Sequence, residues 1–220
     1  MTGSMPTRTV ARALHGLRIF SFLPSVRAMN TLVETLSPNA TTMIRLDHTH
    51  VLATFHQYKT STAPELKRGL VDTICLALEV HAELEEEIFY PAIRAVADNE
   101  AIEKSKPEHD EMRRLIDRLR GMQPTDAGYD DTVMELMRDV MHHVADEETI
   151  LLPEAERLLG DQLGALGARM TKRRLQLVAP RTGEIASAMF RSVSATTLGV
   201  MGGMLAAGLW LGTRHRRYPG

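Results

Sequence analysis

The sequence predicts an all-α protein, most simply a four-helix bundle of up-down-up-down topology with an additional C-terminal helix or helices. Three observations predict this class. Between residues 41 and 160, apolar side chains recur at the three- and four-residue spacing of a helix face. No stretch of the sequence shows the period-two alternation that a half-buried strand needs. One string of histidine and glutamate also occurs twice, as in a bundle with internal pseudo-symmetry.

The first two predicted helices are joined by a short polar connection. The first covers about residues 41–59. The second begins near Thr62 and has Pro64 in its first turn, where proline is favoured, and it runs to about Pro91. Both carry a continuous apolar stripe, so each is expected to bury one face.

The last two predicted helices end at glycines. The third covers about residues 107–120 and stops at Gly121. After a turn-rich connection, the fourth runs from about residue 132 to 159, passes Pro153 and stops at Gly160. Glycine just after the last helical residue is a common helix stop, which supports both boundaries.

The composition is that of one folded domain with extensions. The chain has 220 residues, of which 44% are apolar and 25% charged. These values allow a sizeable core and exclude both a disordered chain of low hydrophobicity and a polytopic membrane protein. A single cysteine, Cys75, excludes an intrachain disulfide framework and any cysteine-based zinc or iron–sulfur site.

Charge is segregated along the chain. The formal charge is +3 over residues 1–40, −12 over 41–160 and +7 over 161–220. We therefore expect an acidic folded unit at 39–160 between basic segments, which either contact something anionic or are solvated. Residues 1–38 are predicted to be a basic, disordered extension, although their acid-free, arginine-bearing start also resembles a transit peptide. No secretory signal is recognised.

The C-terminal third is expected to contain two further helical regions. Residues 161–190 read as a basic helix and a linker, 191–213 as a hydrophobic helix and 214–220 as a basic tail. The hydrophobic segment is long enough to span a bilayer, which predicts a cytoplasmic protein anchored to the inner membrane. The alternatives are a helix packed on the bundle or on a partner, and a peripheral membrane contact through the cations of 169–174.

The repeated string is the most informative motif. HAELEEEIFYP at 81–91 and HVADEETILLP at 143–153 share a histidine, followed by glutamates four and five residues later, isoleucine seven residues later and proline ten residues later. Chance hardly supplies such an aligned pair. The second and fourth helices are therefore predicted to carry the same arrangement of histidine and glutamate side chains.

One histidine of each helix lies on the apolar stripe. His81 and His143 are flanked at helical spacing by core-type residues, among them Ile88 and Ile150. His50 and His142 lie on polar faces instead. The histidines predicted to point into the bundle are His48, His81, His109 and His143.

Glu85 and Glu147 lie one turn after two of these histidines, on the same stripes. A buried, unpartnered carboxylate costs several kcal/mol, and no lysine or arginine lies on the stripes to neutralise it. A metal cation would do so and would also use the imidazoles. Six ligands suit two six-coordinate ions bridged by the carboxylates. The competing interpretations are histidines satisfied within the core and a structural protein that holds no metal.

These residues resemble the hemerythrin HHE cation-binding domain, over about residues 41–160. The resemblance is carried by DHTHV, HAELEE followed by YP, EHDEM, and HVADEE followed by P. It implies a four-helix bundle with a non-haem di-iron centre that binds O₂ or responds to O₂, NO or peroxide. By this resemblance the iron ligands are His48, His81, Glu85, His109, His143 and Glu147, with the two glutamates as bridges.

The sequence departs from oxygen-carrying members at two places. Arg113 stands where they have a second histidine on the third helix, and Glu147 lies four residues after its histidine, where they have an aspartate at five. The resemblance therefore favours binding or sensing of small oxidants, or iron handling, over reversible oxygen carriage. The alternative is a di-iron oxidoreductase that reduces peroxide or oxidises Fe²⁺. No nucleic-acid partner is expected, and no nucleotide-binding or nucleophile motif is found.

Overall fold

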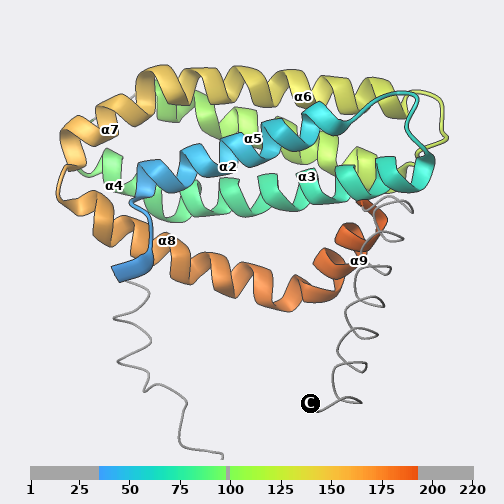
Figure 1. Ribbon diagram of the computed structural model, residues 1–220. Coiled ribbons are helices and arrows are strands. Elements are labelled where there is room, and N and C mark those ends of the chain that lie inside the picture. Colours follow the sequence, from blue (N-terminus) through green and yellow to red (C-terminus); the bar gives the residue numbers. More distant parts are fainter. Residues whose placement is uncertain (1–34, 98–99, 193–220) are drawn as a thin grey trace, which may run out of the picture. The chain divides into compact units, whose positions relative to one another are not determined.

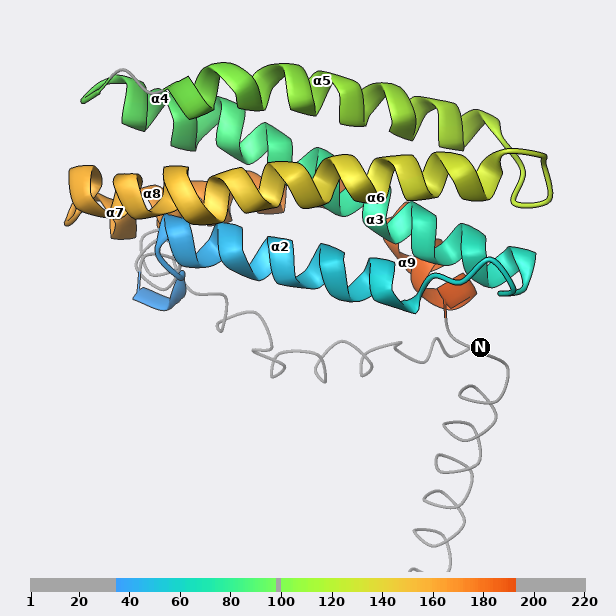
Figure 2. The same cartoon turned by 90° about the horizontal axis from the view of Figure 1, so that it is seen from above.

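The computed structural model describes residues 35–97 and 100–192, and within them all regular structure is helical. Four antiparallel rods form the bundle, as predicted (Figures 1 and 2). The second and fourth rods each consist of an α-helix, a single π-helical turn and a short α-helix. In chain order the rods are α2 (Ala40–Gln57); α3 (Pro64–Leu84), η1 (Glu85–Phe89) and α4 (Tyr90–Arg94); α5 (Glu100–Gly121); and α6 (Tyr129–Asp146), η2 (Glu147–Leu151) and α7 (Leu152–Leu159).

The helix ends follow local signals with one exception. The side chain of Asn39 caps α2 by accepting from the Thr42 N–H at 2.8 Å. The third helix was predicted to begin at Pro107, but α5 begins at Glu100 and carries this proline in its interior. A proline removes one N–H donor only, and the two preceding turns are held by Ile102, which is fully buried.

Both π-helical turns begin at a glutamate of the repeated string. The N–H of Tyr90 donates to the carbonyl of Glu85, and that of Leu152 to the carbonyl of Glu147, so each bond spans five residues. A proline follows each donor. Proline has no N–H group, and its ring clashes with the carbonyl four residues earlier, so it cannot take part in the ordinary i to i−4 hydrogen bonds.

The wider turn also changes which side chains point inward. Ile150 was predicted on the buried stripe, but its side chain is 52% exposed. The extra residue of the turn rotates the helix, so that Leu151 occupies the core position and is fully buried. Phe89, at the matching place in the first string, is fully buried too.

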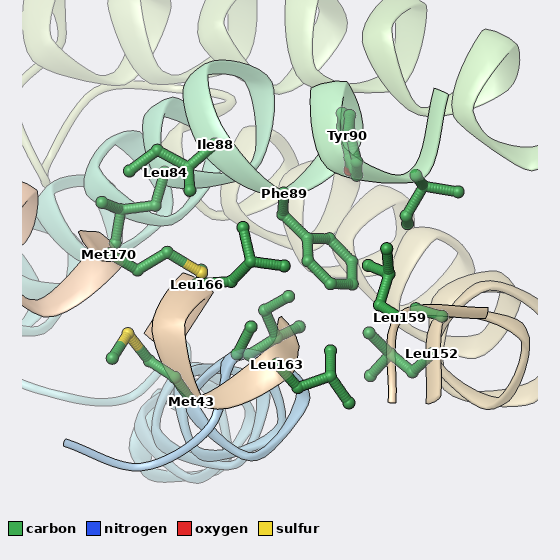
Figure 3. Close-up of a cluster of buried hydrophobic side chains, with 14 of the residues drawn as sticks. Met43, Leu84, Ile88, Phe89, Tyr90, Leu152, Leu159, Leu163, Leu166 and Met170 are labelled. Atoms are coloured by element: carbon green, nitrogen blue, oxygen red, sulfur yellow. The ribbon is translucent and has the colours of Figure 1, made fainter. Parts of the chain in front are cut away.

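The core consists of two apolar clusters with a polar layer between them. One cluster lies towards the α2–α3 connection and includes Phe55, Leu115 and Leu136. The other lies towards α4 and α7, with Phe89 near its centre (Figure 3). Histidines and glutamates from all four rods occupy the layer between the clusters. The two clusters therefore hold the polar groups from both sides.

Helix α8 (Gln162–Val178) completes the second cluster. Its residues Leu163, Leu166 and Met170 are buried and pack beside Phe89 and Met43 (Figure 3). A Cβ at Gly167 would lie 2.1 Å from the carbonyl oxygen of Pro38, so only glycine permits this close approach. The basic helix predicted here is confirmed, and it is an integral part of the packed unit.

The linker predicted after α8 is wrong. Its residues form the 3-10 turn η3 (Ala179–Arg181) and the start of α9 (Thr182–Ser192), which packs along α3 (Figure 1). Arg181 pairs with Glu79 at 2.8 Å, and Arg191 pairs with Asp72 at 2.5 Å. The anionic contact expected for this basic region is thus, in part, the acidic bundle itself.

Several predictions concern segments outside the described residues. These are residues 1–34 of the basic extension at 1–38, most of the hydrophobic helix at 191–213 and the tail at 214–220. Within the described ranges, no helix combines the length and apolar character that crossing a membrane requires.

Candidate metal centre

The polar layer contains all six side chains singled out from the sequence. Each is at most 5% exposed: His48 from α2, His81 from α3, Glu85 from η1, His109 from α5, His143 from α6 and Glu147 from η2. The neighbouring His50 and His142 are exposed. The face argument therefore identified the buried histidines correctly.

Four of these residues form a first group. His48 Nε2 lies 3.2 Å from Glu147 Oε2, and His81 Nε2 lies 3.2 Å from Glu85 Oε2. One candidate ligand atom from each of the four lies within 4.8 Å of all the others. Two imidazoles and two carboxylates at this spacing are a suitable donor set for one divalent cation.

Glu85 also belongs to a second group, with His109 and His143. His109 Nε2 lies 3.4 Å from Glu85 Oε2, and the Nε2 atoms of the two histidines are 3.2 Å apart. Glu147 Oε2 approaches His143 Nε2 at 3.5 Å. The two groups share a carboxylate, so the arrangement fits a pair of ions rather than one.

The inner atoms of the centre lack protein partners. His48 Nε2, His81 Nε2, Glu85 Oε1 and Glu147 Oε2 are buried and accept or donate no hydrogen bond. Buried polar atoms of this kind are rare in native proteins, because each costs about 1–3 kcal/mol. Cations placed between these nitrogen and oxygen atoms would satisfy all four, so the residues fit a metal centre.

Every outer histidine nitrogen, in contrast, has a carboxylate partner from the next rod. His48 Nδ1 lies 2.9 Å from Glu148, His109 Nδ1 2.8 Å from Glu86, His143 Nδ1 2.9 Å from Glu108, and His81 Nδ1 3.5 Å from Asp47. An N–H···carboxylate contact holds the ring and leaves Nε2 free to bind a metal.

This ring of carboxylates has a sequence signal that the ligand search did not use. Asp47 and Glu108 directly precede His48 of α2 and His109 of α5. Glu86 and Glu148 are the second glutamates of the repeated string. In these four cases, an acid next to a candidate ligand on one rod contacts a candidate histidine of a neighbouring rod.

Arginines fix three of these four carboxylates. Arg113 donates to Glu86 at 2.8 Å, Arg45 donates to Glu148 at 3.0 Å, and Arg174 of α8 holds Asp47. Arg113, which replaces a histidine of the oxygen carriers, thus supports the partner of His109 and does not enter the centre. Its side chain is 34% exposed.

Tyr90 is a buried residue of the centre that sequence reasoning did not single out. Its hydroxyl oxygen lies 3.0 Å from Glu85 Oε2 and 2.8 Å from Glu147 Oε1, and its ring stacks on His109. One hydroxyl proton can serve only one carboxylate at a time. The oxygen can accept a hydrogen bond from the other carboxyl when that group is protonated.

The two carboxylates differ in protonation in the absence of metal. Burial, together with the negative charge of Glu147, raises the pKa of Glu85 well above its usual value. Burial alone would also raise the pKa of Glu147, but the nearby imidazoles of His143 and His48 outweigh it and lower that pKa. The pair therefore carries a proton on Glu85 and a charge on Glu147.

The histidines of the first group differ as well. Burial opposes protonation of His48, but Glu147 and the other carboxylates around it prevail and raise its pKa to about 9. Burial dominates at His81 and lowers its pKa to about 4. His81 is thus neutral and ready to bind a cation, whereas His48 must first release a proton.

Two small cavities adjoin the imidazoles on the side of the α2–α3 connection. One is bounded by His48, His81 and His143, and the other by His81 and His109. Apolar side chains line much of both walls, together with Asp47 in the first cavity and Glu79 and Arg113 in the second. Each has a volume of about 10 Å³. This is roughly the space for one water molecule, so these cavities suit small ligands only.

The comparisons with known proteins agree with this geometry. The sequence profile of the hemerythrin HHE cation binding domain matches residues 39–155, which include all six candidate ligands. The crystal structure of a hemerythrin HHE cation binding domain-containing protein from Mycobacterium kansasii superposes with a TM-score of 0.58. It is 19% identical, and the superposition covers 71% of this chain and 99% of that one, so it supports the fold alone.

A curated relative comes from Nostoc sp. and is described as a DNA nickase. It is 32% identical over 113 residues, which are 51% of this chain and 32% of that protein. The chain thus spans about a third of the length of this relative.

Proposed function

This chain belongs to the hemerythrin HHE cation-binding domain family, and we propose that its centre holds two non-haem iron ions and binds or senses O₂, NO or peroxide, or handles iron. The single observation that carries the proposal is the shared carboxylate. Glu85 lies in both ligand groups, and the inner atoms of both glutamates and of two histidines are buried without partners. Iron accepts imidazole and carboxylate ligands together.

Each part of the centre then has a defined task. The four Nε2 atoms and the two carboxylates would hold the ions, and the ring of outer carboxylates would keep the imidazoles oriented. Bound iron would supply reversible redox chemistry and open positions for a small ligand. The hydroxyl of Tyr90 donates a hydrogen bond to Glu147 and so holds that carboxylate towards the centre. Leu78, in the wall of both small cavities, keeps bulk water away.

The size of the cavities supports small oxidants as ligands. Spaces of about 10 Å³ beside the imidazoles suit diatomic molecules or peroxide better than an organic substrate. We extend no DNA-cleaving activity from the Nostoc relative, because the match accounts for 32% of that protein only.

The proposal is tested by metal analysis of the full chain purified from iron-replete cells. We expect two iron ions per chain, with visible absorption that changes on reduction. Glu85→Ala should lose iron, whereas His50→Ala and His142→Ala should keep it, because these two histidines are exposed. Zinc in place of iron, a single ion per chain, or equal losses in all variants would overturn the di-iron proposal.

The alternative function is a di-iron oxidoreductase that reduces peroxide or oxidises Fe²⁺. It is favoured by Arg113, because the missing fifth histidine leaves more positions for reacting molecules than in an oxygen carrier. Mixing the reduced protein with excess hydrogen peroxide or Fe²⁺ separates the two functions. Many turnovers per centre would indicate an enzyme, and a single stoichiometric reaction would indicate a binding or sensing protein.

A further inference from the structure

A helix outside the four-rod bundle reaches the metal centre through one arginine. Arg174 lies in α8, beyond the end of the family match at residue 155. Its Nη1 donates to Asp47 Oδ1 at 2.7 Å, and its Nη2 donates to the other oxygen of the same carboxylate. This two-pronged contact fixes both the position and the plane of the carboxylate.

Asp47 passes this constraint on to a candidate ligand. Its Oδ2 lies 3.5 Å from His81 Nδ1, and the opposite nitrogen of that ring faces Glu85 at 3.2 Å. The Asp47 carboxylate thus lies between the guanidinium of Arg174 and Nδ1 of His81 and contacts both.

The first ligand group depends on this contact more than the second does. His48 and His81 belong to the first group, and Asp47 directly precedes the former on α2 and contacts the latter. In the second group, the outer carboxylate of His109 is held by Arg113, which lies in the bundle itself. Among the outer carboxylates of the described residues, only Asp47, the partner of His81, pairs with an arginine of α8.

We propose that Arg174 is a positioning residue that couples the docking of α8 to metal binding by the group containing His48 and His81. The inference rests on the proposed function of the centre. A carboxylate held by α8 orients His81, and a bound ion holds His81 against that carboxylate. By linkage, the metal ion then stabilises the docked helix to the same extent as the docked helix favours the ion.

The coupling gives the centre a route to the C-terminal helices. Helix α8 continues through η3 into α9, so a change at the centre that displaces His81 is transmitted to both. This would serve a sensing protein, because the state of a buried centre would alter a surface element.

Arg174→Gln tests the proposal, and the adjacent Arg173 offers a matched control. Arg173 pairs with Glu83 and Glu87 on the surface and contacts none of the candidate ligands. Arg174 borders a cavity of about 260 Å³ between α2, α3, α8 and α9, so glutamine fits there without a clash. The apolar residues of α8 still bury their side chains in the variant, so the helix should stay folded.

The measurement is an anaerobic titration of the metal-free full chain with ferrous ammonium sulfate, together with hydrogen exchange of residues 162–178. Wild type and Arg173→Gln should bind two ions and show slower exchange in α8 when loaded. Arg174→Gln should weaken one of the two binding events about tenfold, leave the other unchanged and lose the metal-dependent protection. The iron affinity of Arg174→Lys should lie between those of the wild type and Arg174→Gln, because lysine keeps the positive charge but not the paired N–H donors of the guanidinium.

Asp47→Asn approaches the same contact from the other side. It should reproduce the selective loss, and combining it with Arg174→Gln should add nothing further, because both remove one interaction. Equal iron affinity and equal exchange in Arg174→Gln and Arg173→Gln would overturn this inference alone. A wild-type chain that binds no iron would overturn the proposed function and the inference with it.

Discussion

The two copies of the repeated string have the same backbone but different electrostatics. Each places a histidine on a buried face, begins a π-helical turn at the glutamate four residues later and ends at a proline. Yet the pKa of Glu85 is raised and that of Glu147 is lowered. The shared residues thus specify position, and something outside them specifies charge.

One sequence difference between the two copies lies just before the prolines. The first string has Tyr90 at this place and the second has Leu152. The tyrosine hydroxyl contacts both glutamates, so a single side chain from one half serves the pair. Because two adjacent carboxylates cannot both ionise easily in a buried site, the residue with the better donors, Glu147, keeps the charge.

A second difference between the two halves lies in the outer contacts of the two histidines. The partner of His81 is Asp47, which is 17% exposed and held by Arg174 of α8. The partner of His143 is Glu108, whose side chain is 34% exposed, and no arginine pairs with it in the described part of the chain. The half that contains His81 is therefore the more tightly constrained.

The largest expected effect breaks the centre itself. Glu85→Ala should remove both iron ions, because Glu85 lies in both ligand groups. Glu147→Ala should retain iron in the group with His109 and His143, since the shared carboxylate is intact there. Metal content per chain measures the difference. Equal and complete loss in both variants would mean that the glutamates bridge equally and that the two halves are equivalent.

Tyr90→Phe should have the next largest effect. It removes the hydroxyl between two buried carboxyl groups, and leaving such acceptors unpaired costs about 1–3 kcal/mol of the free energy of unfolding of the metal-free protein. Tyr129→Phe is the matched control, because its buried hydroxyl has no partner. Urea unfolding of both variants compares them. A similar change in both would show that the contacts of the Tyr90 hydroxyl with the two glutamates do not stabilise the centre.

The pH dependence of the metal-free protein should separate His48 from His81. The folded pKa of His48, about 9, exceeds its ordinary 6.5, so its stabilisation is complete below pH 6.5 and is lost as the pH rises through 9. The folded pKa of His81, about 4, is depressed, so stability falls as the pH drops from 6.5 towards 4.

Glutamine variants of the two histidines, unfolded in urea across this range, check the assignment. His48→Gln should flatten the alkaline decline, and His81→Gln should flatten the acidic one. Parallel curves for wild type and both variants would contradict it. Iron binding should strengthen with rising pH in the wild type, because His48 and Glu85 must release protons.

Much of the fold and of the inner site follows from local sequence. Periodicity places the rods, and the same periodicity separates buried His48 and His143 from exposed His50 and His142. These features depend on spacing along one helix, which a sequence states directly.

The misjudged positions depend on contacts between helices or on a change of helical geometry. The extra residue of the π-helical turn moves the core position from Ile150 to Leu151, whereas the matching Ile88 of the first string stays buried in the cluster that α8 completes. The contacts of Tyr90 with Glu147 and of Arg174 with Asp47 join residues far apart in the chain. A single sequence gives each partner but not the pairing.

The smallest expected effect adds a ligand to one half. Arg113→His places an imidazole four residues after His109, where oxygen-carrying hemerythrins have a second histidine. It also removes the ion pair with Glu86. That pair is about a third exposed, so its loss should cost at most about 1 kcal/mol. The iron count should stay unchanged, while the reduced protein should oxidise more slowly in air, followed by its visible absorbance. Arg45→Gln, which removes the matching ion pair with Glu148 in the other half and adds no imidazole, is the control. The same oxidation rate in wild type and Arg113→His would show that a missing fifth histidine does not set the reactivity. The difference between the two halves would then have to be sought in Tyr90 and in the protonation of Glu85.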